Sequence, residues 1–505
     1  MSRRCAPGLY LCALCCALAY PLEMISLSNL ENVTARYALL LPAVWMAGCA
    51  TVDAGPDYER AATEIERAVG HPSLDNPEDS SAGDAATAAL LEGGLTAEES
   101  VKLALLNNPR ARAVLLKIGM ARADVVQAGL WSNPTVGFSF RFPDGGGLAN
   151  FEASLAQNIA ELWMIPARSR AAERDLARMT LDVARELVTL AIDTKVAYFN
   201  AVAADDALMI TRDNVSLTMQ LRDITEARLE AGTVGSLDVN LARGQALRAE
   251  VELRTATLES ETARRTLATL MGMIESAKGI ELTDPLPLPP ERSLQTDRYV
   301  EIALDARLDA RAARDAVEAA AARVELEQAK VFPNLDIGLE IERGERRSGE
   351  SHGTEALVGP SLGFTVPLFD QNQAQIAKAR MVHMETQALL DALERSIMQE
   401  TRDAADRLAS AWDVASLYQQ QVLPQVQETL SLSEATYQAG QTTVLNVIDA
   451  QRSLLETRRA NLAALQDAAN AMAELERATA RPVGELLAAA DLSEPAAATQ
   501  PSEEE

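Results

Sequence analysis

Two stretches of this chain carry the same pattern, RLEAGTVGSLDV at residues 228–239 and TYQAGQTTVLNV at residues 436–447. Each ends a long helical run at Ala-Gly and restarts with Leu-x-Val, and their first residues lie 208 positions apart. Glycine just past a helical run is typical of a helix end, because it readily adopts the left-handed conformation found there. The pattern therefore predicts that Gly232 and Gly440 each end a helix at the turn of a helical hairpin.

The same correspondence extends over both halves of the 505-residue chain. Pro134 corresponds to Pro333 at an offset of 199, whereas the offset at the turns is 208, so the second half has a longer loop between its strands. A unit of this length is far longer than a solenoid repeat. We therefore expect two structural repeats, at 95–273 and 297–480, with a linker at 274–296 whose prolines exclude a helix.

Each repeat shows the same order of elements. Two shorter helices come first, then a pair of strands, then a long helical run that leads into a hairpin. In the first repeat these are expected at 97–132, 134–159 and 161–231. In the second repeat they are expected at 297–331, 333–368 and 370–439. Apolar residues recur every three and four positions along the long runs, which is typical of helices packed along their length. The fold class is therefore mainly α, with duplicated long-helix hairpins and four strands per protomer. Pro424 should kink the second long run.

The strand segments alternate between apolar and polar residues. In PTVGFSFRF (134–142) the valine and phenylalanines share one face and Arg141 lies on the other. In PNLDIGLEIE (333–342) the leucines and isoleucines face away from Asp336, Glu340 and Glu342. An apolar face opposite a charged face is typical of a membrane β-barrel with a wet lumen.

Four strands are too few to close a barrel, so further copies of the chain must complete it. Three copies would bring twelve strands together. Trp131 and Trp163 flank the first strand pair, where an interfacial aromatic belt would lie. The alternative is a soluble β-sandwich that caps a helical bundle, which would require its charged face to be covered.

The N-terminus is typical of a targeting segment. After Arg36, the apolar run YALLLPAVWMAGC is too short to span a membrane. Its ending resembles a bacterial lipoprotein cleavage box, which predicts a signal peptide at 1–48 and acylation of Cys49. The alternative is a plain secretory signal whose cleavage site contains a cysteine. Met24 is a candidate start, because the stretch before it adds an apolar run without a use.

Composition restricts the remaining functions. The net charge of −27 argues against a nucleic-acid partner. All five cysteines lie at or before Cys49, so the body must be stable without a disulfide. The polar residues 49–94 indicate an extended linker that is lipidated at its start. Residues 481–505, which end in PSEEE, indicate an acidic mobile tail.

Motifs for catalysis or metal binding do not stand out. The three histidines, His71, His352 and His383, lie at no ligand spacing with one another or with a cysteine. Met381, His383 and Met384 come together on a helix, which allows soft-metal contact, but helix packing is the plainer interpretation. No phosphate loop, catalytic triad or paired-acid motif is evident. We therefore expect no enzyme activity, no cofactor and no metal site.

Together these features resemble the TolC-like outer-membrane efflux proteins. The resemblance covers about 95–480 and rests on the duplicated plan, on NP and FP before the strands, on VPLFD (366–370) and on YQAGQTTVLNVIDAQRSL (437–454). The stretch CATVDAGPDYERAA (49–62) resembles the lipidated members. The run that begins LTAEESVKLALLNNPRARAV (95–114) is similar to the heavy-metal, or cobalt–zinc–cadmium, branch.

The resemblance implies a homotrimer in the outer membrane of a Gram-negative bacterium, with a 12-stranded barrel in outer-membrane lipid and a hollow α-helical barrel in the periplasm. It implies the passive exit duct of a tripartite efflux pump, and the similarity to the heavy-metal branch suggests heavy-metal cations as the substrate. An inner-membrane transporter of the resistance-nodulation-division type and a periplasmic adaptor (membrane fusion) protein would deliver the substrate. The adaptor would dock on the two turns, at Arg228, Leu229, Gly232, Val234, Ser236, Tyr437, Gly440 and Thr443.

The resemblance also implies a pore constriction near the second turn. The family pattern has two acidic positions there, which fall on Asn446 and Asp449, and Asp238 is the first-turn equivalent of Asn446. A basic residue that ties the closed tips in the family is replaced by Thr442. A ring of Asp449 side chains would favour cations. The alternative is that Asp449 lies on the outer helical face and is simply solvated.

Three other interpretations stay open at this point. The outer-membrane duct of a type I protein-secretion system has the same architecture. A lipidated periplasmic adaptor or binding protein should carry one helical hairpin within split β-domains, not two copies with amphipathic strand pairs. A purely structural coiled-coil lipoprotein should lack the alternating strands.

Overall fold

The computed structural model describes residues 51–70, 93–142, 144, 149–273, 280–289, 294–332, 334–348 and 351–491, without the side chains of 345–348, 351–354 and 488–491. The chain divides into two compact units, Met1–Thr51 and Val52–Glu505, and every element named below belongs to the second. The expected signal peptide, Cys49 and most of the expected tail lie outside the described residues.

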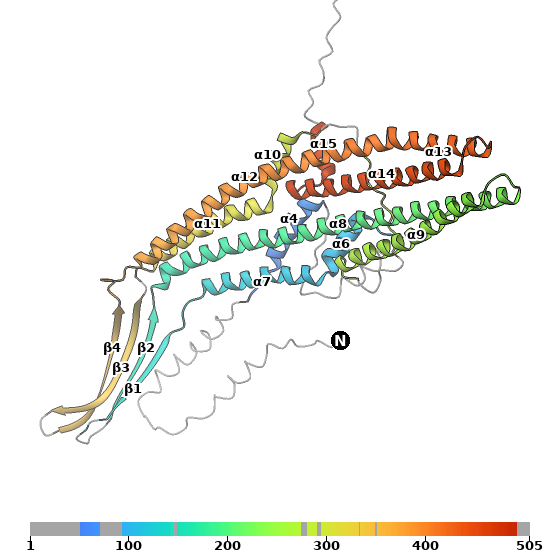
Figure 1. Ribbon diagram of the computed structural model, residues 1–505. Helices are drawn as coiled ribbons and strands as arrows, with labels where there is room; N and C mark the ends of the chain where they lie inside the picture. The colour runs from blue at the N-terminus through green and yellow to red at the C-terminus, as the bar shows by residue number, and fades with distance from the viewer. Residues whose placement is uncertain are drawn as a thin grey trace, which may run out of the picture. The chain divides into compact units, whose positions relative to one another are not determined.

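The first structural repeat comprises, in order, α6 (Ala97–Asn107), α7 (Pro109–Gly129), β1 (Thr135–Arg141), β2 (Asn150–Asn158), α8 (Glu161–Glu230) and α9 (Ser236–Leu270) (Figure 1). A capping box begins α6, because the Thr96 hydroxyl accepts from the Glu99 N–H and the Glu99 carboxylate accepts from the Thr96 N–H. The Asn108 side chain caps α7 by accepting from the Arg110 N–H. Helices α6 and α7 correspond to the two shorter helices expected before the strands.

The second repeat has the same order: α10 (Thr296–Ala306), α11 (Leu308–Ala329), β3 (Leu335–Ser348), β4 (Ser351–Phe364), α12 (Gln373–Leu417), α13 (Leu423–Gln438) and α14 (Val444–Thr479). A π-helical turn, Tyr418–Val422, separates α12 from α13. Pro424 lies two residues after its end, in the first turn of α13. Proline lacks an N–H and its ring crowds the carbonyl four residues earlier, which the wider π turn can accommodate. The interruption expected from Pro424 therefore takes the form of a π turn just before it.

Two segments outside the expected repeats are helical, and the expectation of an extended linker is wrong for the first of them. Helix α4 (Gly55–Val69) lies within the expected linker, and α15 (Val483–Asp491) opens the expected tail. The apolar residues of α4 recur at helical spacing and are buried: Tyr58, Ala61, Ile65 and Ala68. Short helices gain most of their stability from packing of an apolar face. The polar residues around such a face hide it when only the composition of the segment is considered.

The strands form one antiparallel sheet in the order β1-β2-β3-β4 (Figure 1). Its register builds apolar layers across all four strands, such as Phe138, Ala153, Ile341 and Val358. Phe138 is 67% exposed and Val358 64%. The described strands thus form a single open sheet, which contradicts the β-sandwich alternative, since a sandwich needs two packed sheets.

Helix α8 is the central packing element of the second unit. It contacts α4, α6, α7, α9, α11 and α14, and so touches both repeats. Among the described helices, it has an apolar 18-residue window long enough to cross a membrane, but 56% of that window is buried, as in a core helix. The Tyr198 hydroxyl of α8 donates to the Leu95 carbonyl and accepts from the Asp284 N–H, each at 2.8 Å, and so ties the inter-repeat linker to the helix.

Candidate functional site

The turn between α8 and α9 is a Schellman motif. The Gly232 N–H donates to the Leu229 carbonyl and the Thr233 N–H to the Arg228 carbonyl, both at 2.9 Å. Gly232 has a φ of +70°, a conformation that residues with a Cβ rarely adopt. Gly232 follows the cap residue Ala231. The cap of α8 therefore lies one residue before the glycine that was expected to end the helix.

The turn between α13 and α14 has the same hydrogen bonds. The Gly440 N–H donates to the Tyr437 carbonyl and the Gln441 N–H to the Thr436 carbonyl, again at 2.9 Å. Gly440 has a φ of +73° and follows the cap residue Ala439. The matching sequences of the two stretches therefore encode one turn geometry twice.

The two turns contact each other through Arg228 and Tyr437. The Arg228 Nη1 donates to the Tyr437 carbonyl at 2.8 Å, and the guanidinium carbon lies 4.5 Å from the centre of the tyrosine ring. That distance allows cation–π attraction. Tyr437 is buried and shares a small apolar cluster with Leu221, Val444, Val447 and Ile448. The sequence placed both residues on a docking surface but gave no signal that they join the two hairpins, because pairing so far along the chain leaves no local pattern.

The other candidate docking residues lie at the surface of the turns. Leu229, Gly232, Ser236, Gly440 and Thr443 are exposed, and Val234 is half-buried. Both Leu-x-Val motifs divide in the same way: Leu237 and Leu445 are 69% and 49% exposed, whereas Val239 and Val447 are 3% and 1% exposed. The valine of each motif therefore packs the hairpin, and the leucine is free for a partner.

The candidate constriction residues lie near the same end of the helices. Asn446 and Asp449 are exposed and lie one turn apart on α14. Asp238 is half-buried, and its carboxylate accepts from the Gly235 N–H at 3.2 Å, so it also helps to begin α9. The Thr442 hydroxyl lies 3.5 Å from the Thr436 hydroxyl within its own turn. One protomer encloses only part of any pore, so the exposure of Asp449 fits both the constriction and the solvated alternative.

The polar face of the sheet is acidic. Glu152 lies directly opposite Glu342 in the register, and Arg141 Nη2 approaches Glu152 Oε2 at 2.6 Å. Like charges directly opposite each other repel, so this face requires water or counter-ions. Trp131 and Trp163 are 51% and 38% exposed, and lie before β1 and in the first turn of α8, where the strands meet the helices.

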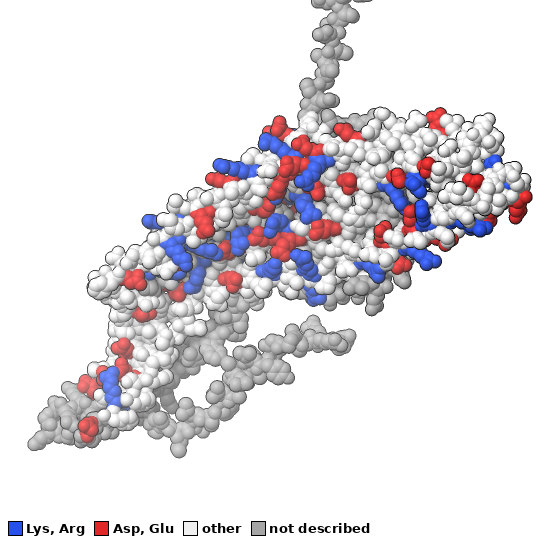
Figure 2. Space-filling view, viewed as in Figure 1, with Lys and Arg blue, Asp and Glu red and all other residues white. Residues whose placement is uncertain are grey.

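The described residues include no group of three His, Cys, Asp or Glu side chains that could hold a metal ion. His383 is half-buried on α12 between the exposed Met381 and Met384. His71 and the side chain of His352 lie outside the described part of the chain. On the face in Figure 2, basic and acidic side chains intermingle over the helices, so the negative net charge does not gather into one patch there.

Long helical hairpins with capped turns, joined to a small sheet that is apolar on one face and acidic on the other, define a class of outer-membrane channel. The chain belongs to the outer membrane efflux protein family, whose pattern matches residues 100–273 and 299–481. It is thus an outer-membrane efflux channel of the TolC family, a family of channels and not of enzymes. The alternative of a lipidated adaptor is thereby discarded.

Named relatives and solved structures agree with this assignment. The chain is 26% identical over 319 residues to the cobalt-zinc-cadmium resistance protein CzcC of Cupriavidus metallidurans, covering 62% of this chain and 73% of that protein. It is 26% identical to the probable outer membrane lipoprotein SilC of Salmonella typhimurium, covering 70% and 79%. It is 24% identical to the outer membrane protein TolC of Escherichia coli, covering 70% and 76%.

The fold is similar to that of solved channels. The structure of CusC has a TM-score of 0.62 at 21% identity, over 76% of this chain and 91% of that one. The open state of the Neisseria gonorrhoeae MtrE outer membrane channel has a TM-score of 0.60 at 19% identity, over 76% and 89%. At such identities the likeness is one of fold alone.

Proposed function

We propose that this chain forms, as a homotrimer, the passive exit duct of a tripartite efflux pump in the outer membrane of a Gram-negative bacterium. A periplasmic adaptor and an inner-membrane transporter of the resistance-nodulation-division type deliver the substrate. The observation that carries the proposal is the sheet, with an exposed apolar face opposite an acidic one. Three such sheets supply twelve strands, enough to close a barrel whose apolar side faces lipid and whose acidic side faces water.

The helical tips form the entrance of this duct. The exposed Leu237 and Leu445 occupy equal positions after the two turns and offer an adaptor similar apolar contacts. Arg228, Leu229, Gly232, Val234, Ser236, Tyr437, Gly440 and Thr443 are the proposed docking set, in which the buried Tyr437 acts through its contact with Arg228. Substituting Leu237 and Leu445 by Ser should reduce cross-linking to the adaptor while trimer levels persist, and unchanged cross-linking would move the docking surface elsewhere.

Asp449 forms an acidic ring at the constriction, with Asp238 and Asn446 beside it. Close carboxylates of this kind favour cations and bind divalent ions. The wild-type channel should be cation-selective in a planar bilayer and partly blocked by divalent ions, and Asp449→Asn should lose most of that block. If Asp238→Asn abolished selectivity while Asp449→Asn left it intact, the constriction would lie at the first turn.

Two features anchor the duct in the membrane. Acylation of Cys49 attaches the N-terminus to lipid, and Trp131 and Trp163 contribute to an aromatic belt where the strands meet the helices. The lipobox-like sequence and the exposure of both tryptophans support this. Metabolic labelling with an alkyne fatty acid should mark the wild type, and equal labelling of Cys49→Ser would contradict acylation there.

The proposed substrate class is heavy-metal cations. The name of CzcC and the acidic face of the sheet support it. A deletion strain should become sensitive to divalent cations more than to organic drugs, and complementation should reverse this. Loss of secreted proteins with unchanged cation tolerance would instead favour the type I secretion duct.

A further inference from the structure

Helix α4 is fastened to the first repeat by a buried carboxylate. Asp57 is fully buried, and its two oxygens accept from Arg122 Nε at 2.5 Å and Arg122 Nη2 at 2.8 Å. Arg122 belongs to α7, and Arg60 of α4 completes the ion pair. A buried carboxylate with a fork-shaped guanidinium partner is a specific contact, because loss of either member leaves the other charge unpaired.

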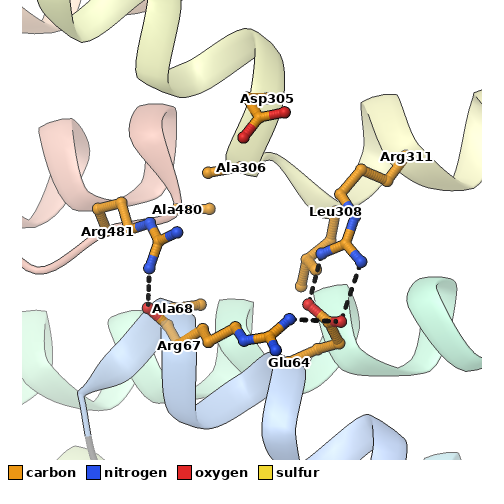
Figure 3. Close-up of a pocket in the computed structure, with 9 residues that line it drawn as sticks. All are labelled: Glu64, Arg67, Ala68, Asp305, Ala306, Leu308, Arg311, Ala480 and Arg481. Atoms are coloured by element: carbon orange, nitrogen blue, oxygen red, sulfur yellow. Dashed lines mark hydrogen bonds and ion pairs between the residues drawn. The ribbon is translucent and has the colours of Figure 1, made fainter.

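The other end of α4 is fastened to the second repeat. Glu64 accepts from both terminal nitrogens of Arg311 in α11, with Arg311 Nη2 at 2.9 Å, and from Arg67 Nη1 at 3.2 Å. Arg481, which follows α14, points its Nη1 toward the Arg67 carbonyl at 3.4 Å. These side chains surround a hollow of about 320 Å³ between the ends of α4, α10 and α14, with the Glu64 pairs on one side (Figure 3).

The apolar side of α4 packs on α8 and α7 of the first repeat. Ala61 and Ile65 belong to a buried cluster that extends from these helices to α11 and α14 of the second repeat, among them Ile118, Leu187, Leu308 and Ala473. Gly119 permits the close approach of α4 to α7, because a Cβ there would lie 2.9 Å from the Tyr58 hydroxyl. Helix α4 therefore packs on the first repeat and crosses the seam to the second repeat mainly by charge.

We propose that α4 is a strap: it locks the two repeats of a protomer together at the seam and so holds the hairpins α8–α9 and α13–α14 in one arrangement. This inference rests on the proposed channel function. It assigns the segment just after Cys49 a mechanical role in the helical body, so that the proposed lipid-bearing end of the chain is tied to both repeats.

The test combines hydrogen exchange with conductance in the full-length trimer. The variants are Glu64→Gln, Arg311→Gln and the double variant. Glu318→Gln is the matched control, because Glu318 pairs with Arg174 and thereby joins α11 to α8 without α4. Each single variant should raise amide exchange in α4 by about tenfold, since it removes a charged hydrogen-bonded pair. Each should also lengthen the time that the channel spends in its larger conductance state.

The increase in α4 exchange should be no larger in the double variant than in the more affected single variant, because the two side chains act as a unit. The control should leave α4 exchange and channel opening unchanged. Unchanged α4 exchange in the single variants, or faster exchange without a change in channel opening, would overturn the strap. A wild-type protein without unitary conductance would instead contradict the channel function. If a Gln variant fails to assemble, Arg311→Lys replaces it, because it keeps the charge and loses the two-pronged contact.

Discussion

At the scale of single residues, Gly232 and Gly440 set the geometry of both turns. Open space surrounds the position that a Cβ would take on Gly232, so only the backbone conformation selects glycine there. At Gly440 the nearest atom is the Arg228 Nη2, at 3.9 Å, which is ordinary contact. The two glycines therefore act through the backbone and not through packing.

Replacing either glycine by alanine should loosen its turn. The left-handed conformation costs a residue with a Cβ about 1–2 kcal/mol. Gly244→Ala is the control, because Gly244 lies within α9 with open space around it, and alanine there should stabilise the helix by about 0.5–1 kcal/mol. Exchange of the Thr233 and Gln441 amides measures both effects. Equal exchange in the turn variants and the control would show that the φ values do not select glycine.

Arg228 belongs to the first turn and joins it to the second through its contact with Tyr437. Arg228→Gln should remove both the hydrogen bond to Tyr437 and the cation–π contact, and so weaken the joint between the hairpins by about 1 kcal/mol. Tyr437→Phe should have a smaller effect, because the ring and the carbonyl remain. Arg222→Gln is the control, since Arg222 pairs with Asp223 on its own helix.

Amide exchange in Val444–Ile448, together with opening in a planar bilayer, measures this joint. Opening should rise in the order control, Tyr437→Phe, Arg228→Gln. The same opening for Arg228→Gln and Arg222→Gln would mean that the contact between the turns does not restrain the entrance.

At the scale of elements, ion pairs hold the ends of helices in place. The hydrogen bond from Arg311 lowers the pKa of Glu64 below its ordinary value of 4.5. Burial opposes ionisation of Asp309, but the hydrogen bond and charge of Arg307 outweigh it and leave the pKa of Asp309 below 3.8. Asp206 differs, because burial and the neighbouring Asp205 raise its pKa.

Acid should therefore loosen α4 and α11. A carboxyl whose folded-state pKa is lowered stabilises the fold above its unfolded pKa, and this contribution disappears as pH falls through the folded value. Exchange in α4 and α11 should accelerate as pH drops below about 4.5, after correction for intrinsic exchange rates. The pKa of Asp206 is shifted in the opposite direction, so amide exchange in α8 near Asp206 should not accelerate with it.

Glu64→Gln should flatten the pH dependence of α4, because the glutamine cannot titrate. Glu318→Gln should retain that dependence. An α4 helix whose protection is constant between pH 6 and pH 3 would show that the Glu64 pair contributes nothing to its docking.

At the scale of the whole molecule, no element among the described residues covers either face or either edge of the sheet. Exposed apolar side chains over a whole face mark a lipid or protein contact in a native assembly. Trimerisation and membrane insertion therefore complete a fold that one chain begins.

The two faces should respond oppositely to the same substitution. Phe138→Arg places a charge on the apolar face and should cost about 2–4 kcal/mol per protomer near the middle of a bilayer. Ser139→Arg, one residue later on the polar face, should be tolerated. Trimer recovered from the outer-membrane fraction measures the difference, and equal recovery of both variants would contradict the assignment of the lipid-facing side.

The sequence by itself determined the mainly helical class, the four strands with their two faces, the positions of the two turns and the family. These features rest on local periodicity and on glycine and proline, whose effects are confined to a few neighbouring residues. The duplication could be recognised in the sequence for the same reason, since each repeat carries its own copy of those signals.

Only the tertiary structure decided the helical state of α4 and α15, the contact between Arg228 and Tyr437, and the pairing of Glu64 with Arg311. Each depends on groups brought together from distant parts of the chain. Burial stabilises α4 although its flanking sequence is polar, and an ion pair between segments 247 residues apart leaves no local pattern. Local chemistry thus specifies the elements, whereas the contacts that join the two repeats follow from how those elements pack.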